Sequence, residues 1–299
     1  MQADSIRPLY VVTWNIAGAQ AAAAAPQGFT AQDKWAQLAA HVERWQPGIV
    51  ALQESPITEA LPCLDRAYRL LGAARAHAGH VQLYARRELT AEVLPDVAGV
   101  PAVLARVSVG PASVVIAAVH CEPGLEGVTK RAEQVRAVMA SVDVAESSAF
   151  VLLGDLNVRL AEVPELLEST ELRDAHYDGA SWDPRINKFD DRLIGKGIEG
   201  QRYDRVWFKG GAWAQAFLVG KCRLFANGLH YYLSDHFAVF GMVDVHASHG
   251  PCGATSEREE RRVGLGKLRM AVLLQEREAV RQLEQDAIAR DKAAQLRVA

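Results

Sequence analysis

Short apolar runs separated by glycine and proline recur from residue 9 to about residue 245 of this 299-residue chain. Runs of about 4–8 residues that are rich in Val, Ile, Leu and aromatic residues are typical of β-strands. Helical patterns interrupt them at residues 30–45, where Thr30 is placed as an N-cap, and at about residues 126–142. Two clusters of strands mixed with helices predict an α/β fold in which two sheets pack face to face with helices outside them.

The individual elements can be placed from their flanking residues. A short helix is expected from Ser55-Pro56 to about Arg66, because proline favours the first turn of a helix. The expected strands share apolar character and flanking turn residues, and they are 9–16, 47–54, 68–76, 80–86, 90–97, 101–109, 113–121, 150–153, 202–210, 213–225 and 236–245.

The chain divides into a domain and a tail. We expect one domain over residues 1–246, followed by a linker at residues 247–256, which contain Gly, Ser and Pro. Residues 257–299 have few β-branched residues and no proline, so they predict a helical tail. The apolar residues of the tail follow helical spacing only in part, which leaves two expectations open: the tail docks on the domain or on a partner protein.

Composition excludes several classes of protein. No apolar run approaches the roughly 20 residues that a membrane helix needs, and the N-terminus lacks the basic and apolar sections of a secretory signal. We therefore expect no membrane span and an intracellular location, cytoplasmic or nuclear. Four scattered cysteines without a C-x-x-C pair favour reduced thiols over disulfides or a zinc site.

Charge is uneven along the chain. The formal net charge of −3 argues against a uniformly basic coat for nucleic acid. Between residues 185 and 223, however, nine basic residues stand against four acidic ones. This surplus fits an anionic ligand and a solvated loop equally well.

Polar side chains end several of the apolar runs. Asp155 and Asn157 follow the run 150–153, and because residues two apart share a face of an extended chain, the pair presents an acceptor and a donor to one point. Similar strand ends are occupied by Asn15, Glu54, His120, Asp235 and His236. Each residue alone has a simpler reading as a turn, a cap or a structural residue. Turn formation does not explain why all of them occur at such junctions.

This set of side chains is suited to a limited chemistry. Glu54 and Asp235 offer the hard oxygen ligands that Mg²⁺ and Mn²⁺ prefer. Asp155 is suited to orient or deprotonate a water, Asn157 to donate to an oxygen, and the two histidines to donate to an oxyanion. The set therefore predicts attack of water on a phosphate, and no G-x-S-x-G motif for a serine nucleophile occurs.

The segments TWNIAG, LQE, VH, GDLN, YDRVW and SDHF, in this order over residues 9 to about 245, resemble the endonuclease/exonuclease/phosphatase superfamily. The resemblance implies a DNase I-like four-layer sandwich of two mixed β-sheets flanked by helices, and a metal-dependent phosphodiesterase or phosphatase. Within the superfamily, SWDPRIN and RYDRVWF are similar to segments of the tyrosyl-DNA phosphodiesterase 2 family. This similarity implies a DNA-repair enzyme that hydrolyses a phosphodiester at a nucleic-acid 5′ end with Mg²⁺ or Mn²⁺ as cofactor.

The resemblance also implies roles for individual residues. It makes Glu54 the metal ligand, with Asn15 and Asp235 near the metal. It makes Asp155 the residue that activates or orients the attacking water, with Asn157 as its partner. It assigns the scissile phosphate to His120 and His236, and the orientation of His236 to Asp204. Expected contacts with substrate are Arg159, Trp182 and Asn187, although packing is the simpler reading of Trp182.

Some positions depart from the family pattern and leave the substrate open. The family commonly has an acid where this chain has Ala17, a Ser and an Arg where it has Pro123 and Leu125, and a Tyr where it has His80. One alternative keeps the chemistry and changes the substrate, as in an endonuclease or exonuclease, a deadenylase, an inositol phosphatase or a sphingomyelinase-like enzyme. Another is a non-catalytic binding module of the same fold, which Ala17 favours and the retained polar residues disfavour.

Overall fold

Two six-stranded sheets form the centre of the molecule. The computed structural model describes residues 8–18, 30–142, 149–187, 189–190, 193, 195–221, 224–226, 229–245, 264, 266–278, 281–282 and 285. Sheet A has the order β11-β14-β1-β2-β4-β3 and contains β1 (Leu9–Asn15), β2 (Ile49–Ser55), β3 (Tyr68–Arg75), β4 (His80–Arg86), β11 (Ala212–Val219) and β14 (Ala238–Val245). Sheet B has the order β5-β6-β7-β8-β10-β9 and contains β5 (Ala91–Val93), β6 (Ala102–Val109), β7 (Ala112–His120), β8 (Ala149–Asp155), β9 (Arg173–Asp174) and β10 (Asp204–Gly210).

Each sheet is mixed, with one parallel pair among antiparallel neighbours. The parallel pairs are β1 with β2 and β7 with β8. Each connection between the partners of a parallel pair contains a helix, α1 (Ala31–Trp45) in the first and α2 (Val128–Ala140) in the second, as parallel strands require a crossover. A small hairpin of β12 (Leu224–Ala226) and β13 (Leu229–Tyr231) stands apart from both sheets.

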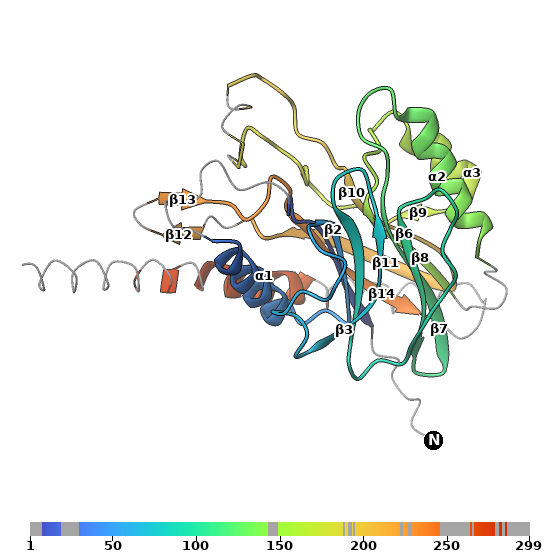
Figure 1. The fold of residues 1–299 in the computed structure, drawn as a ribbon, viewed down its shortest axis with the longest axis horizontal. Coiled ribbons are helices and arrows are strands. Elements are labelled where there is room, and N and C mark those ends of the chain that lie inside the picture. Colours follow the sequence, from blue (N-terminus) through green and yellow to red (C-terminus); the bar gives the residue numbers. More distant parts are fainter. Residues whose placement is uncertain are drawn as a thin grey trace, which may run out of the picture.

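Helices cover the outer face of each sheet. Thr30 caps α1 through a capping box with Asp33, as its position predicts, and Leu38 and Val42 of this helix pack on sheet A. On the other side, α2 and α3 (Val163–Thr170) pack on sheet B. Figure 1 shows α1 and the pair α2 and α3 on opposite sides of the two sheets. The predicted four-layer sandwich is therefore confirmed.

The alternation of side chains along the strands decides which polar residues meet. In β8, Val151 and Leu153 belong to the apolar core between the sheets, whereas Phe150 and Leu152 pack under α2 and α3. Asp155 is the next residue on the inter-sheet side. The apolar core between the sheets thus ends in a polar layer at this edge of the sandwich.

The expected helix from Ser55-Pro56 to Arg66 is wrong. Residues 62–67 form turns, and the residues before them are irregular. The Gln82 side chain donates to the carbonyls of Ile57 and Glu59, and the Tyr84 hydroxyl accepts the N–H of Leu61. A helix needs these same backbone groups for its own bonds, so the side chains of β4 stabilise an irregular loop in its place.

Several elements differ from the expectation in extent or were not foreseen. The strand expected over 213–225 ends at Val219, because Gly220 takes a positive φ of +72°. The helix α3, the two-residue strand β9 and the hairpin of β12 and β13 are additional elements. Short segments of this kind have too few residues to show a period.

The described part of the tail is helical and packs on the domain. Val272 joins the apolar cluster on the outer face of sheet A. The buried Glu276 carboxylate accepts hydrogen bonds from Trp45 Nε1 at 3.0 Å and from the Gly220 N–H at 2.7 Å. The expected linker at 247–256 lies outside the described residues, and a protein partner for the tail stays a prediction. Within the described chain, no helix has the length and apolar character to cross a membrane.

Four of the nine basic residues between residues 185 and 223 form ion pairs inside the domain. Arg185 pairs with Asp183, and Arg202 and Arg205 both pair with Asp174. Lys209 pairs with Glu171. Lys188, Arg192 and Arg223 lie outside the described residues. The paired cations indicate that much of this charge stabilises the domain itself.

Candidate active site

Three neighbouring strands of sheet B present a row of polar side chains at one level. His120 ends β7, Asp155 ends β8 and Asp204 begins β10, and in the strand register Asp155 is opposite both His120 and Asp204. Each residue continues the face that the strand turns toward sheet A. The row therefore follows directly from regular strand pairing.

Asp155 is held by its own loop and by sheet A. Its Oδ1 accepts the Asn157 N–H at 2.9 Å, and its Oδ2 accepts Asn15 Nδ2 at 3.0 Å. Asn157 has a left-handed φ of +52° and donates its side-chain amide to the Cys121 carbonyl at 3.1 Å. This arrangement fixes the Asp155 carboxylate, but it turns the Asn157 amide toward the backbone of the neighbouring loop.

Glu54 reaches the site by an irregular path. Along β2 it alternates with Gln53, so regular pleating places it on the same side as Leu52, which faces α1. A register shift between Leu52 and Ser55 and a left-handed φ of +59° at Glu54 change this direction. Its Oε1 then accepts Asn15 Nδ2 at 3.1 Å, so that the single amide of Asn15 bridges Glu54 and Asp155.

The second oxygen of Glu54 is suited to a cation. Among the described residues, Glu54 Oε2 is covered from solvent and has no hydrogen-bond partner. Burial raises the pKa of Glu54 above its ordinary value, against the hydrogen bond from Asn15 and the nearby imidazoles, and Asp235 adds to the increase. A covered carboxylate oxygen beside a second carboxylate is a ligand set that suits Mg²⁺ or Mn²⁺.

Asp235 is oriented by its neighbours in the loop before β14. Its Oδ2 accepts the Trp182 Nε1–H at 3.3 Å, and its Oδ1 lies 3.4 Å from the Ser234 hydroxyl oxygen. That hydroxyl donates its single proton to the Asn15 carbonyl at 2.6 Å. Ser234 therefore links the β1 end to the segment that carries Asp235 and His236.

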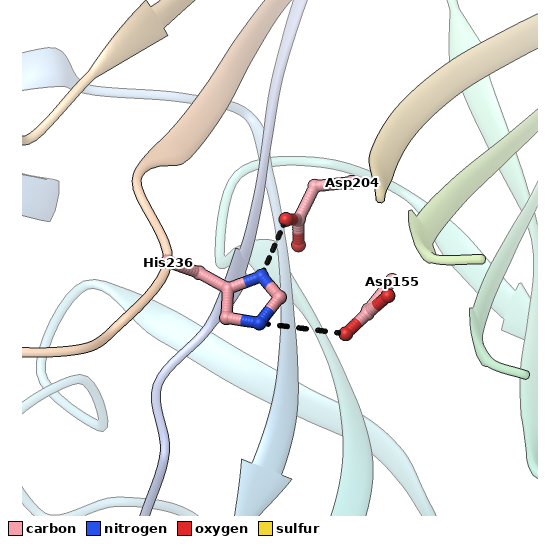
Figure 2. A group of neighbouring side chains, drawn as sticks. All are labelled: Asp155, Asp204 and His236. Carbon is pink, nitrogen blue, oxygen red and sulfur yellow. Dashed lines mark hydrogen bonds and ion pairs between the residues drawn. The ribbon is translucent and has the colours of Figure 1, made fainter. Parts of the chain in front are cut away.

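His236 and Asp204 form a buried pair that joins the two sheets. Figure 2 shows the imidazole between two carboxylates: Nδ1 lies 2.7 Å from Asp204 Oδ2, and Nε2 lies 3.9 Å from Asp155 Oδ2. Burial alone lowers the pKa of His236, but Asp204, together with Asp235 and Asp155, outweighs it and holds this pKa well above the ordinary value. The arrangement stabilises a protonated imidazole whose Nε2–H faces Asp155.

His120 approaches Asp155 from the other side without a carboxylate behind it. Its Nε2 lies 3.7 Å from Asp155 Oδ2, and within the part of the chain that the structure describes its Nδ1 has no hydrogen-bond partner. Distances of 3.7 and 3.9 Å exceed a direct hydrogen bond, so neither Nε2 is bonded to Asp155. Both ring nitrogens are suited to donate to the oxygens of a phosphate.

A second group of side chains also has a spacing that suits a metal. One atom each from Asp155, Asp204 and His236 lie within 4.8 Å of one another. The bond between His236 and Asp204 already uses one ring nitrogen and one carboxylate oxygen of this group. We therefore favour a cation at Glu54 and Asp235.

The three expected substrate contacts lie at different depths. Trp182 borders the site beside Asp235 and packs on the Tyr203 ring at 5.8 Å between centroids. Arg159 donates to the Gly124 carbonyl at 2.9 Å in the loop after β7. Asn187 is buried and donates to the Ser234 carbonyl at 2.8 Å, so it lies behind the segment of Asp235. Their contact with a substrate stays a prediction.

Sequence reasoning gave no role to two polar residues that the fold brings to the site. Ser234 lies in the segment SDHF, in which only the two residues that follow it, Asp235 and His236, were given a role. Lys34, in the first turn of α1, donates to the Ala17 carbonyl at 3.0 Å. No sequence pattern distinguishes Lys34 from an exposed lysine of an amphipathic helix.

Solved structures share this fold at low sequence identity. TDP2 from C. elegans is 19% identical over 81% of this chain and 77% of its own, with a TM-score of 0.62. TDP2 from D. rerio, complexed with a single-strand DNA product, is 17% identical over 81% and 100%, also with a TM-score of 0.62. An endonuclease/exonuclease/phosphatase family protein from Bacteroides thetaiotaomicron is 15% identical over 83% and 100%, with a TM-score of 0.59. No protein-family profile and no curated protein matches the chain in sequence. The chain has the DNase I-like fold.

Proposed function

We propose that this protein is a metal-dependent hydrolase that cleaves a phosphodiester with Mg²⁺ or Mn²⁺. The observation that supports this most directly is the convergence on one atom, Asp155 Oδ2. Asn15 Nδ2, His120 Nε2 and His236 Nε2 lie 3.0, 3.7 and 3.9 Å from it, at the edge where both sheets end. A carboxylate can accept a proton from an attacking water, and the neighbouring donors can hydrogen-bond to the oxygens of a phosphate.

Asp155 is the proposed base. It takes a proton from the water whose oxygen bonds to phosphorus as the ester oxygen leaves. Asn15 and the Asn157 backbone hold the carboxylate in place. The Asn157 amide donates one N–H to the Cys121 carbonyl, so its second N–H is the one that remains for a substrate oxygen.

The two imidazoles stabilise the charge that develops on the phosphate. His236, held by Asp204, donates from Nε2, and His120 donates from the opposite side. Glu54 and Asp235 would hold a divalent ion, which would supply positive charge to offset the charge that develops in the reaction. The side-chain oxygen of Asn15 already accepts the Ala17 N–H at 3.0 Å. Asn15 therefore acts through its side-chain NH₂ group, which bridges Glu54 and Asp155.

For the substrate, we propose a nucleic-acid 5′ end, in the first instance a 5′-phosphotyrosyl ester. The support is the resemblance of the segments around Trp182 and Asp204 to the tyrosyl-DNA phosphodiesterase 2 family, and the fold shared with a TDP2 that holds a DNA product. A tyrosyl leaving group has a pKa of about 10, so it departs with little help from an acid. This agrees with a site in which no further acid is needed beside the leaving oxygen.

The test is release of tyrosine from a 5′-phosphotyrosyl DNA oligonucleotide in Mg²⁺. The panel includes a plain oligonucleotide, a poly(A) RNA, an inositol polyphosphate and sphingomyelin. Asp155→Asn is expected to reduce turnover about 1,000-fold with little change in melting temperature, because the amide keeps the shape and loses the base. Asp178→Asn, at an exposed loop position, is the matched control.

Each outcome selects one reading. Release that requires both Mg²⁺ and Asp155 supports the 5′-phosphotyrosyl substrate. Activity on another member of the panel with the same requirements keeps the chemistry and replaces the substrate. No activity on any member supports the binding module, and equal activity of Asp155→Asn removes Asp155 from the mechanism.

A further inference from the structure

Lys34 is a buried cation beside the site. Its side chain lies in the first turn of α1, with a residue exposure of only 8%, and its Nζ lies 5.5 Å from the centre of the Phe189 ring. Burial lowers the pKa of Lys34 to about 8, while Asp235 and Glu54 oppose this decrease. The influence of both carboxylates shows that the ammonium lies within electrostatic reach of the proposed metal ligands.

The Lys34 ammonium holds a strained turn. It donates to the Ala17 carbonyl at 3.0 Å, and Ala17 has a left-handed φ of +44°. Such a conformation is unfavourable for alanine and persists only where surrounding contacts fix it. The next peptide is fixed as well, because the Gly18 N–H donates to the Glu54 carbonyl at 3.1 Å.

The same turn aims the side chain that connects the two halves of the site. The Ala17 N–H donates to Asn15 Oδ1 at 3.0 Å. Since the oxygen of Asn15 is held there, its Nδ2 must face the other way, toward Glu54 Oε1 and Asp155 Oδ2. An unbroken series of hydrogen bonds therefore leads from Lys34 through Ala17 and Asn15 to both carboxylates.

We propose that Lys34 is a positioning residue of the catalytic site: by fixing the Ala17 turn it orients Asn15, and so sets the geometry in which Glu54 meets the metal. This role rests on the proposed function only through the metal. If Lys34 acted only as a positive charge near the two carboxylates, it would repel the metal ion, and its removal would strengthen metal binding. The two roles thus predict opposite changes in metal affinity.

The test is a double-mutant cycle with metal binding as its readout. Mn²⁺ and Mg²⁺ affinities are measured by isothermal titration calorimetry for the full chain, Lys34→Met, Asn15→Ala and the double variant. We expect Lys34→Met to weaken binding about tenfold in the wild-type background and less than twofold in the Asn15→Ala background, because residues that act in series are not additive. Lys130→Met, which removes an exposed lysine paired with Glu122, is the matched control and leaves affinity unchanged.

The outcomes separate this inference from the proposed function. Equal losses in both backgrounds, or tighter binding by Lys34→Met, overturn the positioning role while the phosphodiesterase proposal stands. A wild-type chain that binds neither ion overturns both. If Lys34→Met does not fold, Lys34→Arg takes its place, because arginine retains a hydrogen-bond donor. Its metal affinity is expected to lie within threefold of the wild-type value. A tenfold loss of metal affinity in folded Lys34→Arg contradicts the positioning role. The coupling stands on binding alone even when no substrate on the panel is cleaved.

Discussion

The two sheets build their halves of the site in different ways. On sheet B, His120, Asp155 and Asp204 are opposite one another in regular register at the ends of three neighbouring strands. On sheet A, a register shift and a left-handed backbone conformation change the direction of the Glu54 side chain. Ala17, after the end of β1, is a second residue with a left-handed backbone. One half is a continuation of secondary structure, and the other depends on local strain.

This difference matches the chemistry that we propose for each half. A base and its neighbouring donors need fixed distances, which strand pairing provides for the backbone while Asn15 and Asn157 hold the Asp155 carboxylate. A cation site needs several oxygens to converge from different directions, which a regular strand does not provide because its side chains alternate. Backbone strain at the end of β2 and after β1 supplies that convergence.

The regular half is most easily broken at Gly154. A Cβ at this position lies 2.0 Å from the Val119 carbonyl oxygen, and its φ is +149°. Strain and overpacking each cost about 1–3 kcal/mol, so Gly154→Ala is expected to lower the free energy of unfolding by about 4 kcal/mol and to abolish activity. Chemical denaturation measures this change.

Gly110→Ala is the matched control for Gly154→Ala. Gly110 also has a positive φ, of +58°, but nothing lies within 4 Å of a Cβ built there. Its substitution is expected to cost only about 1 kcal/mol. Equal costs at the two positions contradict a special closeness of β7 and β8 at the site.

The strained half is tested by Glu54→Gln. We expect turnover in Mg²⁺ to fall by about 100-fold or more and the Mg²⁺-induced rise in melting temperature to disappear, because the covered Oε2 is lost as an anionic ligand. Metal-free stability is expected to stay equal or to increase, since the substitution removes the charge of a partly buried carboxylate whose Oε2 has no hydrogen-bond partner among the described residues. Differential scanning calorimetry with and without Mg²⁺ measures both effects.

Glu59→Gln serves as the control for Glu54→Gln, because Glu59 is exposed in the following loop. It should keep the wild-type response to Mg²⁺. A Glu54→Gln variant that still gains stability from Mg²⁺ moves the cation site elsewhere, with the group of Asp155, Asp204 and His236 as the next position to test.

The junction between the halves is tested by Asp204→Asn. Asp204 lies on sheet B and orients His236 of the sheet A side through a bond of 2.7 Å. Without the carboxylate, the protonated imidazole loses its main stabilising charge, and we expect turnover to decrease by about 100-fold. Steady-state kinetics with the substrate found in the panel measures this, and an effect below threefold shows that His236 needs no orienting partner.

The smallest effect on activity is expected from the tail, whose described part packs on sheet A. Val272 is buried on the outer face of that sheet, so Val272→Ala is expected to cost about 2 kcal/mol of stability and to change turnover less than twofold. Hydrogen exchange locates the effect: faster exchange is expected in β11 and not in β8. Leu274→Ala, at an exposed tail position, is the control. If Val272→Ala increases amide exchange equally in β11 and β8, the tail does not stabilise sheet A selectively.

Much of the fold was predictable because periodic patterns are local. The helix at residues 31–45 begins after Thr30 as expected, and the strand at 150–153 continues to Asp155. The shared face expected for Asp155 and Asn157 is wrong, because Asn157 lies beyond the strand with a left-handed φ of +52° and its amide donates to the Cys121 carbonyl. The loop at 56–67 was not predictable, because its proline indicates a helix while the distant Gln82 and Tyr84 bind the backbone groups that a helix requires. Contacts from another strand outweighed the local preference.

The sequence by itself determined the faces of the row on sheet B: the alternation in each strand puts His120, Asp155 and Asp204 on one face of their strands. Only the tertiary structure decided the alignment of these three residues across the strands, the direction of Glu54 and the burial of Lys34 against Ala17. The physical reason is the range of the forces involved. Alternation is fixed by a residue and its neighbours, whereas a left-handed turn or a buried charge persists only when residues far apart in the chain stabilise it.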